Sequence, residues 1–384
     1  MTKKTRWILL GVCAIVFFIA APYIVFYSLG YRVNFTTWKI HGTGGIYVYA
    51  APEPESILID NRAAKNTGLF STAVFAQNLL PGPHSVLITK EGYHDYQKTL
   101  EVKEKEVTKL ETVTLFKKDI AFQIVPAALA TATQPALTAK EQFANLAKPP
   151  TELFIIKNNT LYYADVPENA PLTALQKTTP AIKNIVTHKT VQSAILWLGI
   201  DGMLYRSDAR GQNTQTVSTT ALSINKKKTY KLESLASHIF LQEDRAAFLL
   251  NAQTGEFENF YPMVDGMELS PDGQKIAYYN TQELWYWLPK AGVVVQNILL
   301  QKTQGAIKNV YWLNNDYLIF SESDTIVISE IDVRGNINTI RLPQTIVLAE
   351  AITIKNPALF FEQQDKKLYL LTQNTLMVSE RLVP

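Results

Sequence analysis

The longest uninterrupted run of apolar positions lies near the N-terminus. Residues 7–31, WILLGVCAIVFFIAAPYIVFYSLGY, form a run of 25 residues without a charged side chain, and a helix needs roughly 20 residues to cross a bilayer. Lys3, Lys4 and Arg6 precede the run, and only Arg32 follows it closely. Because basic residues favour the cytoplasmic side, we predict a cytoplasmic tail at 1–6, a transmembrane signal anchor at 7–31 and an extracytoplasmic remainder.

Two other interpretations of this run stay open. A cleaved signal peptide usually has an apolar core of about 7–15 residues and a small-residue cleavage site, whereas Ala20-Ala21-Pro22 lies in the middle of the run. The stretch LLGVC resembles a lipoprotein signal, but Val12 stands where a small residue is expected before Cys13. We therefore expect a single-pass protein whose anchor is not cleaved.

Residues 43–118 alternate between apolar and other positions with a period of two. The apolar positions that carry the pattern are Ile46, Val48, Ala50, Val86, Ile88, Leu100 and Val102. Turn-forming residues separate the runs, at Pro52–Pro54, Asp60-Asn61, Pro81-Gly82 and Glu91-Gly92. Short alternating strands with turns about every 8–12 residues indicate an all-β sandwich.

The residues of this segment resemble the PEGA domain family. The order IYVYAAP, ILIDN, LLPGPHSVLITKEGY, TLEV, VTL follows the family's succession of strands and turns. The residues on the hairpin motif are Leu79, Gly82, His84, Lys90, Gly92 and Tyr93. The first turn, PEPES, departs from the pattern, and Asn61 replaces a glycine, although asparagine also accepts a positive φ. The resemblance implies a non-catalytic surface module, often placed beside a membrane anchor.

Residues 151–384 repeat one pattern six times. Each unit reads as an apolar strand, a polar turn, a second apolar strand, a turn and a third strand. The turn after the second strand starts near Asp165, Asp208, Asn251, Pro289, Asp332 and Gln373, at steps of 38–43 residues. A period of about 40 residues with four short strands is typical of a β-propeller blade. We therefore predict a propeller of about six blades, or seven if residues 119–125 begin another.

The fourth unit adds a motif to the period. The stretch ELSPDGQKIAYY, with Ser270-Pro271-Asp272-Gly273 before an apolar strand, resembles the repeat of TolB-like and WD40-like propellers. Proline presets φ for such a turn and glycine takes the permissive position. The fifth unit has the looser equivalent YWLNNDYLIF. The resemblance implies a propeller of this kind and does not transfer a function.

Between the two predicted domains, residues 119–150 change composition. The part from 126 to 150, PAALATATQPALTAKEQFANLAKPP, is rich in alanine, threonine and proline. Such a shift is typical of a linker. Within it, TAKEQFANLA can form a helical turn or two capped by Thr138.

Charge and cysteine content exclude several classes of function. The net charge is +3, and Lys3, Lys4 and Arg6 account for all of it. No basic stripe remains to neutralise a run of phosphates, so we expect no nucleic-acid partner. Cys13 is the one cysteine, which rules out an intramolecular disulfide and a cysteine-based metal site.

The histidines are the remaining candidates for chemistry. His84 and His94 lie within the stretch LLPGPHSVLITKEGYHDYQ beside a tyrosine and an aspartate, while His41, His188 and His238 are scattered. An extended strand of ten residues spans roughly 33 Å, so the two rings meet only if the turn folds the chain back in register. We interpret them as packing residues of a hairpin.

Other candidate residues also have a plain structural interpretation. Asp201-Gly202 and Asp272-Gly273 are typical of tight turns rather than of calcium loops. Trp285, Tyr286 and Trp287 could line a carbohydrate or peptide groove, but at least one of them must pack between blades. No metalloprotease, nucleophile-elbow or phosphate-loop motif occurs. We therefore predict no catalytic, cofactor-binding or metal-binding residue.

We predict a membrane-anchored extracytoplasmic binding or scaffold protein that is not an enzyme. A propeller held off the membrane would bind a protein or a cell-envelope polymer on the face where its loops converge. A propeller-based hydrolase, a glycosidase or a peptidase-associated domain, is one alternative. It would need two carboxylates about 5–10 Å apart on the central channel. A TolB-like component of an envelope assembly is the other.

Overall fold

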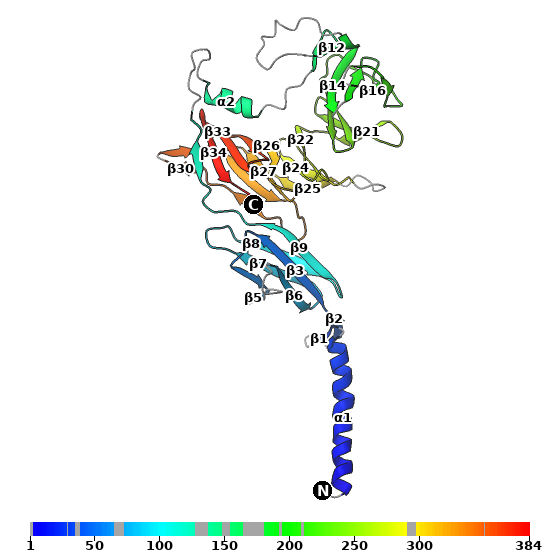
Figure 1. The fold of residues 1–384 in the computed structure, drawn as a ribbon, viewed down its shortest axis with the longest axis vertical. Coiled ribbons are helices and arrows are strands. Elements are labelled where there is room, and N and C mark those ends of the chain that lie inside the picture. Colours follow the sequence, from blue (N-terminus) through cyan, green and yellow to red (C-terminus); the bar gives the residue numbers. More distant parts are fainter. Residues whose placement is uncertain are drawn as a thin grey trace. The chain divides into compact units, whose positions relative to one another are not determined.

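The structure is a computed structural model of the chain, and Figure 1 shows its elements in chain order. It describes residues 3–28, 30–34, 39–64, 73–126, 137–147, 154–163, 180–191, 194–208, 211–289, 297–348 and 350–384. The chain packs as two compact units. Unit 1 comprises Met1–Ala121, Ser329–Ile340 and Glu380–Pro384, and unit 2 comprises Phe122–Ile328 and Arg341–Ser379.

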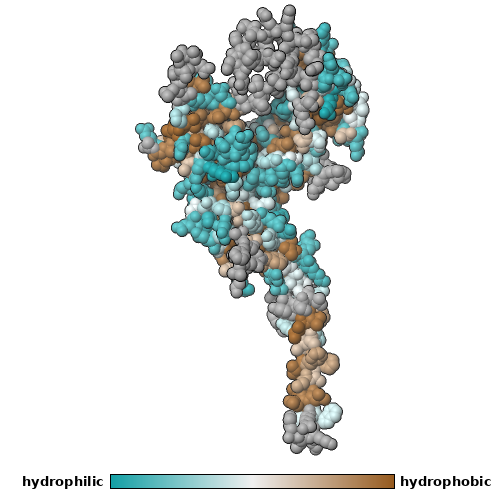
Figure 2. Space-filling view, viewed as in Figure 1, coloured by the Kyte–Doolittle hydropathy of each residue, from teal (hydrophilic) through white to brown (hydrophobic). Residues whose placement is uncertain are grey.

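Unit 1 begins with the apolar helix α1, Lys3–Ser28. Its stretch Leu9–Phe26 is long and apolar enough to cross a membrane, and none of that stretch is buried within the described part of the chain. Phe18 is 75% exposed, and the helix is coloured as hydrophobic along most of its length in Figure 2. The predicted apolar helix is confirmed. It ends at Ser28 rather than at residue 31, because Gly30 takes a φ of 81° and the chain turns into a strand.

Two short strands join α1 to a β-sandwich. Strand β1, Tyr31–Asn34, pairs with β2, Lys39–Gly42. The sandwich strands are β3 (Gly44–Ala51), β4 (Ser56–Ile59), β5 (Arg62–Ala63), β6 (Val74–Leu79), β7 (Gly82–Thr89), β8 (Tyr96–Val102) and β9 (Val107–Thr114). One sheet has the order β6-β3-β9 and the other β5-β4-β7-β8. Strands β3 and β9 run parallel.

The core of the sandwich consists of the positions that the alternation predicts. Ile46, Val48, Ala50, Val86, Ile88, Leu100 and Val102 are all at most 1% exposed. On the other face of β3, Tyr49 is 41% exposed. Each buried aliphatic side chain contributes about 1.5–3 kcal/mol through removal of apolar surface from water, so this alternation stabilises the sandwich.

The edge of strand β8 is covered by residues 329–340, which belong to the same unit. The Asn336 side chain donates to the Gln97 carbonyl at 2.8 Å and accepts from the Thr99 amide at 3.3 Å. The Asn338 side chain accepts from the Gln97 amide at 3.4 Å. These two asparagines satisfy backbone groups that an edge strand otherwise leaves open.

A buried ion pair lies beneath this segment. Lys98 of β8 is completely buried, and its Nζ lies 2.5 Å from Oε1 of Glu330, which is itself 3% exposed. The same Nζ donates to the backbone oxygens of Asp332 and Asn336 at 2.8 and 3.0 Å. Tyr96 donates its hydroxyl to Oε2 of Glu330 at 2.8 Å. Two buried charges are stable only with such a full set of partners.

Unit 2 consists of successive antiparallel sheets. Its first four sheets comprise β11 (Phe154–Lys157), β12 (Thr160–Tyr163), β13 (Pro180–Lys183), β14 (Ile185–Val191), β15 (Ala194–Gly199), β16 (Leu204–Asp208), β17 (Gln215–Thr216), β18 (Tyr230–Leu235), β19 (His238–Glu243), β20 (Ala246–Leu250), β21 (Phe257–Tyr261), β22 (Gly266–Leu269), β23 (Ile276–Tyr279), β24 (Glu283–Trp287) and β25 (Asn297–Lys302). Three of these sheets have four strands, and the sheet β11-β12-β13 has three described strands.

The remaining strands complete two more sheets and one hairpin. They are β10 (Phe122–Ile124), β26 (Ile307–Trp312), β27 (Tyr317–Glu322), β28 (Thr325–Glu330), β29 (Thr339–Arg341), β30 (Thr345–Val347), β31 (Ala351–Thr353), β32 (Ala358–Glu362), β33 (Lys367–Thr372) and β34 (Thr375–Arg381). The sheet orders are β26-β27-β28-β29 and β10-β34-β33-β32, while β30 and β31 pair with each other. Among the described residues, these strands form six blade-like sheets, and only parts of β28, β29 and β34 belong to unit 1. The predicted propeller of about six blades is confirmed.

The last sheet joins the two ends of the propeller sequence. Its outer strand β10 precedes all other strands of unit 2, and it pairs antiparallel with β34 near the C-terminus. Phe122 lies opposite Ser379 and is 8% exposed. Residues 119–125 therefore complete the sixth sheet and do not begin a seventh.

The structure changes the predicted linker at 119–150. This range contains β10, so the propeller strands begin at Phe122 rather than at residue 151. It also contains helix α2, Ala139–Leu146, with Thr138 as its N-cap and a capping box between Thr138 and Glu141. The predicted helical turns are confirmed. The range 151–384 is also not uniform, because Ser329–Ile340 and Glu380–Pro384 pack with unit 1.

Candidate functional site

The structure places His84 at a turn of the sandwich. Its Nδ1 lies 2.6 Å from Oδ2 of Asp60 and its Nε2 lies 2.7 Å from the Leu80 carbonyl oxygen. Asp60 and Asn61 have φ values of 50° and 62°, which confirms that asparagine replaces glycine in this turn. Burial alone would raise the pKa of Asp60, but hydrogen bonds from His84 and Ser85 hold it below its usual value. His84 therefore stabilises the turn between β4 and β5.

His94 lies at the opposite end of the hairpin. The register pairs His84 with Leu100 and Ile88 with Tyr96, so the two histidines are separated by roughly 20 Å along the strands. Burial, with a contribution from Lys118, lowers the pKa of His94. The two rings do not share a site. Across the described residues, no three histidine, cysteine, aspartate or glutamate side chains gather in a group that could hold a metal ion.

The two Asp-Gly pairs form turns, as predicted. Gly202 and Gly273 have φ values of 80° and 70°. Oδ1 of Asp201 accepts from the Met203 amide at 3.1 Å, and Oδ1 of Asp272 accepts from the Gln274 amide at 3.0 Å. Both carboxylates are therefore used by the turns in which they lie.

The aromatic residues of β24 pack within the propeller. Trp287 is 4% exposed and its ring meets those of Phe240 and Phe260 edge to face, at 5.9 and 5.5 Å between centroids. Trp285 stacks on Tyr278 at 6.4 Å. The contacts of Trp287 join two neighbouring sheets, and the contact of Trp285 lies within one sheet. This packing accounts for the aromatic run without a ligand groove.

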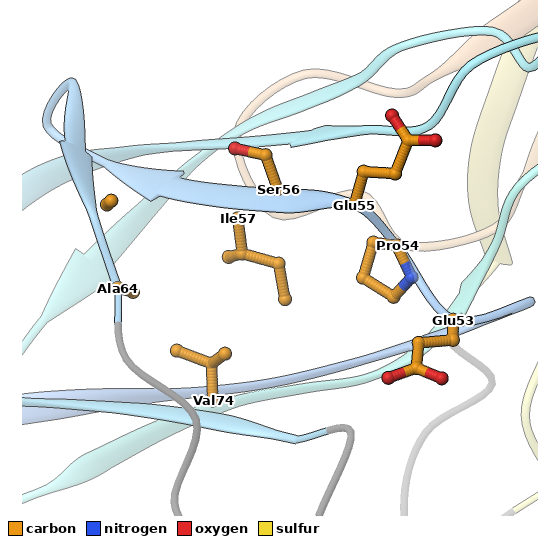
Figure 3. Close-up of a pocket in the computed structure, with 8 residues that line it drawn as sticks. Glu53, Pro54, Glu55, Ser56, Ile57, Ala64 and Val74 are labelled. Carbon is orange, nitrogen blue, oxygen red and sulfur yellow. The ribbon is translucent and has the colours of Figure 1, made fainter.

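A small pocket opens between the two sheets of the sandwich (Figure 3). Its volume is about 160 Å³, and it is lined by Glu53, Pro54, Glu55, Ser56, Ile57, Ala63, Ala64 and Val74. Ile57 and Val74 point into it from β4 and β6, while the two glutamates lie at one end. Because Ala64 borders residues 65–72, which lie outside the described residues, we assign no site to this pocket.

Charged and aromatic side chains gather on the first strands of the propeller sheets. The first strand of each blade lies next to the central channel of a propeller, and here β14 adjoins β18, β22 adjoins β26, and β26 adjoins β32. These five strands contribute Lys189, Glu233, Glu268, Tyr311 and Phe360, in that order. All five side chains are partly exposed. We call these residues the inner row.

Glu233 is the neutralised carboxylate of the inner row. Its Oε2 lies 3.0 Å from Nζ of Lys189 and its Oε1 lies 2.7 Å from Nζ of Lys231. Burial by itself would raise the pKa of Glu233, but hydrogen bonds from the two lysines outweigh this and lower it. Glu233 is therefore ionised and has both oxygens occupied.

Glu268, in contrast, has a carboxylate that is not paired with another described residue. Its backbone carbonyl accepts from Nε1 of the buried Trp312 at 2.9 Å, but its carboxylate forms no hydrogen bond or ion pair with any residue that the structure describes. Burial raises the pKa of Glu268 to about 7, and the nearby Glu233 adds to this shift while Lys231 opposes it. The two carboxylates thus have pKa values displaced in opposite directions.

Two tyrosines lie beside Glu268. Burial, followed by the charge of Glu268, raises the pKa values of both Tyr279 and Tyr311 to about 12. The Tyr279 ring packs directly over Gly266, where an added Cβ would lie 2.7 Å from its hydroxyl oxygen. The Tyr311 ring meets that of Phe360 edge to face at 6.0 Å. The surroundings of Glu268 are therefore aromatic as well as charged.

Sequence patterns alone do not identify this cluster. Glu268 precedes the SPDG turn, and Tyr279 ends the strand that follows it, so the fourth unit contains both residues. Tyr311, Glu233 and Lys189 come from three other units. Only the packing of the sheets brings these side chains together.

Comparisons with solved structures return matches of low similarity, among them a β-propeller domain. The propeller domain of Cps50 (Swd1) from Myceliophteria thermophila is 11% identical, with 50% of this chain and 68% of that one covered and a TM-score of 0.34. The N-terminal domain of Nup159 is 11% identical, with 70% and 82% covered and a TM-score of 0.36. The extracellular domain of a putative hybrid two-component system from B. thetaiotaomicron is 11% identical, with 86% and 39% covered and a TM-score of 0.39. The assignment of the fold rests on strand order.

Sequence comparisons give one family. No curated protein sequence matches the chain. Residues 43–117 match the PEGA domain family, the range that the strand pattern and the hairpin motif indicate. The match spans the sandwich from β3 to β9 and leaves α1 and the propeller outside. The chain therefore carries a PEGA domain at residues 43–117, between an apolar N-terminal helix and a β-propeller.

Proposed function

We propose that this chain is a single-pass membrane protein that binds or scaffolds a protein partner through its propeller on the extracytoplasmic side. The exposed apolar surface of α1 supports anchoring, because such a surface is unfavourable in water and suits a bilayer. The basic residues Lys3, Lys4 and Arg6, which precede the apolar stretch Leu9–Phe26, support a cytoplasmic N-terminus. No catalytic role is included in this proposal.

The observation that supports binding most directly is the inner row of the propeller. Its side chains come from five consecutive sheets, are partly exposed and combine charges with aromatic rings. Tyrosine and phenylalanine, the aromatic members of this row, are among the residues enriched where proteins recognise their partners. A cell-envelope polymer or a TolB-like assembly is the competing partner, and the experiment below separates these cases.

Hydrolysis is the second candidate, since Glu233 and Glu268 form a pair of carboxylates with oppositely displaced pKa values. Such a pair is the arrangement by which a hydrolase separates its acid from its base. In this propeller, however, both oxygens of Glu233 are held by lysines, at 3.0 and 2.7 Å. A carboxylate occupied in this way is a poor nucleophile or base, so binding is the better supported function.

Photo-crosslinking in cells tests the proposed function. A photoreactive residue would replace the exposed Lys308 on the inner strand β26, and a control would replace the exposed Glu256 before β21. We expect a discrete protein adduct from position 308 and none, or a weaker one, from position 256. A polydisperse adduct would identify a polymer, several envelope proteins together would identify an assembly, and no adduct from position 308 would refute protein binding through this face.

A further inference from the structure

The carboxylate of Glu268 is costly for the folded chain. It is partly buried and has no hydrogen-bond donor or ion-pair partner among the described residues, and an ionised carboxylate that loses part of its hydration without gaining a partner is destabilised. Nothing in the packing of β22 requires a charge here, because the contact with Trp312 uses the backbone oxygen. A glutamine would fill the same space. A group that is costly and unused by the fold points to an external partner.

The surrounding charges indicate which ligand this partner would offer. Lys189 and Lys231 are already engaged by Glu233, so they are not free to neutralise Glu268. An anionic ligand next to Glu268 would meet its ionised carboxylate, which is unfavourable. A cation would neutralise Glu268, which has no cationic partner of its own among the described residues. The electrostatics therefore favour a positively charged group.

The neighbouring rings favour the same kind of ligand. Tyr279 and Tyr311 lie on either side of the strand that carries Glu268, on β23 and β26, and Phe360 extends the row to β32. The faces of aromatic rings attract amines and guanidinium groups within about 6 Å. A carboxylate next to tyrosine rings thus combines an ion pair with cation–π contacts.

We propose that Glu268, with Tyr279 and Tyr311, binds the cationic side chain of a protein partner, a lysine amine or an arginine guanidinium. This inference rests on the proposed function in one respect, since it takes the partner to be a protein. It adds the chemistry by which that partner is recognised.

Binding of short peptides to the full chain in detergent tests this site. The probes are blocked glycine peptides that carry one arginine, one lysine or one glutamate, titrated to millimolar concentration while the tyrosine and tryptophan fluorescence is recorded. We expect the arginine and lysine peptides to bind and the glutamate peptide not to bind. If neither cationic peptide binds, or if the glutamate peptide binds more tightly, the proposal is wrong.

Variants then assign the binding to these residues. Glu268→Gln should weaken binding of the cationic peptides by about 10- to 100-fold, because it removes a charged hydrogen-bond partner. Glu350→Gln removes the same charge from an exposed position of unit 2 and should leave binding within about twofold. Tyr311→Leu should weaken binding more than Tyr311→Phe, which keeps the ring. Equal binding by Glu268→Gln and the wild type would contradict the proposal.

The pH dependence supplies a readout that a structural role would not give. A cation binds the ionised form of Glu268, so affinity should rise between pH 6 and pH 8 and should lose this dependence in Glu268→Gln. The titratable groups around Glu268 are Lys231 and Glu233 of β18, Lys189 of β14, Asp265 before β22, Tyr279 of β23 and Tyr311 of β26. Affinity that falls over this range would mean that the protonated carboxyl donates to the ligand, and would overturn the proposal.

Two further outcomes separate this inference from the proposed function. Cleavage of a chromogenic glycoside or peptide that is lost in Glu268→Gln would make Glu268 an acid catalyst, and the proposal would fail. If the photo-crosslinks find no protein partner while the cationic peptides still bind through Glu268, the proposed function fails and the site remains. If protein adducts form and Glu268→Gln binds the cationic peptides as tightly as the wild type does, only the inference fails.

Discussion

Replacement of Lys98 by methionine is the most informative perturbation of unit 1. The change leaves Glu330, which is 3% exposed, without its cation at 2.5 Å. It also removes the donor to two backbone oxygens, at 2.8 and 3.0 Å. Breaking one partner of a buried ion pair costs about 3–5 kcal/mol. Because about 1.4 kcal/mol corresponds to a factor of ten, residues 329–340 should open roughly 100- to 5,000-fold more often.

Hydrogen exchange followed by mass spectrometry measures this opening. Peptides covering 329–340 should exchange faster in Lys98→Met by the factor above. In Lys98→Met with Glu330→Gln, exchange should return to within about tenfold of the wild type, since glutamine carries no charge and can still accept from Tyr96. Lys103→Met, at an exposed position, is the matched control and should change nothing. Exchange within about threefold of the wild type in Lys98→Met would refute the reasoning.

Three other substitutions test separate parts of the structure. Glu268→Gln should stabilise the chain by about 1–3 kcal/mol at pH 8 and by much less at pH 4. The folded pKa of Glu268 is about 7 against an ordinary 4.5, so the free energy of unfolding of the wild type falls as the pH rises between these values. Equal effects in denaturant titrations at both pH values would contradict this. Gly202→Ala should lower the free energy of unfolding by several kcal/mol, since φ is 80° and the new Cβ would collide with the Leu222 carbonyl oxygen. Gly273→Ala, with φ of 70° and no atom within 4 Å of the new Cβ, should lower it by about 1 kcal/mol. Equal melting temperatures of the two variants would contradict this difference. Thr138→Ala should destabilise α2 by about 1 kcal/mol, seen as faster exchange of residues 139–146, and unchanged exchange would argue against the capping box.

Local patterns predict the sandwich and the blades because each depends on neighbours in the chain. The period of two places Ile46, Val48, Leu100 and Val102 in the core, and all four are buried. The capping box of α2 spans four residues and can be recognised in the same way. The apolar run at 7–31 locates α1 to within a few residues of its ends.

The completion of the last propeller sheet depends on residues far apart in the sequence. Strand β10 has three residues, FQI, too few for a periodic signal. Its partner β34 lies more than 250 residues later. Composition therefore favours a linker for 119–150, and only the pairing of Phe122 with Ser379 shows that this stretch completes the last sheet.

The sequence marks Lys98 as an unusual residue but does not identify its partner. The positions of β8 alternate so that Lys98 lies on the same face as Leu100 and Val102, which marks it as a lysine on an apolar face. Its partner Glu330 is separated from it by 232 residues, so no spacing rule connects the two. For the same reason, Glu268 and Glu233 could be recognised as neighbours only once the sheets were packed.

Topology mapping by cysteine labelling tests the central claim of an anchored, extracytoplasmic propeller most directly. Cys13 is the single cysteine and is exposed on α1, so Cys13→Ala gives a clean background. In this background, Val347→Cys, at a position 79% exposed in unit 2, should react with a membrane-impermeant maleimide in intact cells whose outer layers admit the reagent. Thr5→Cys, before the apolar stretch, should react only after lysis. Labelling of position 5 but not of position 347 in intact cells, or release of the chain by alkaline carbonate, would contradict the account.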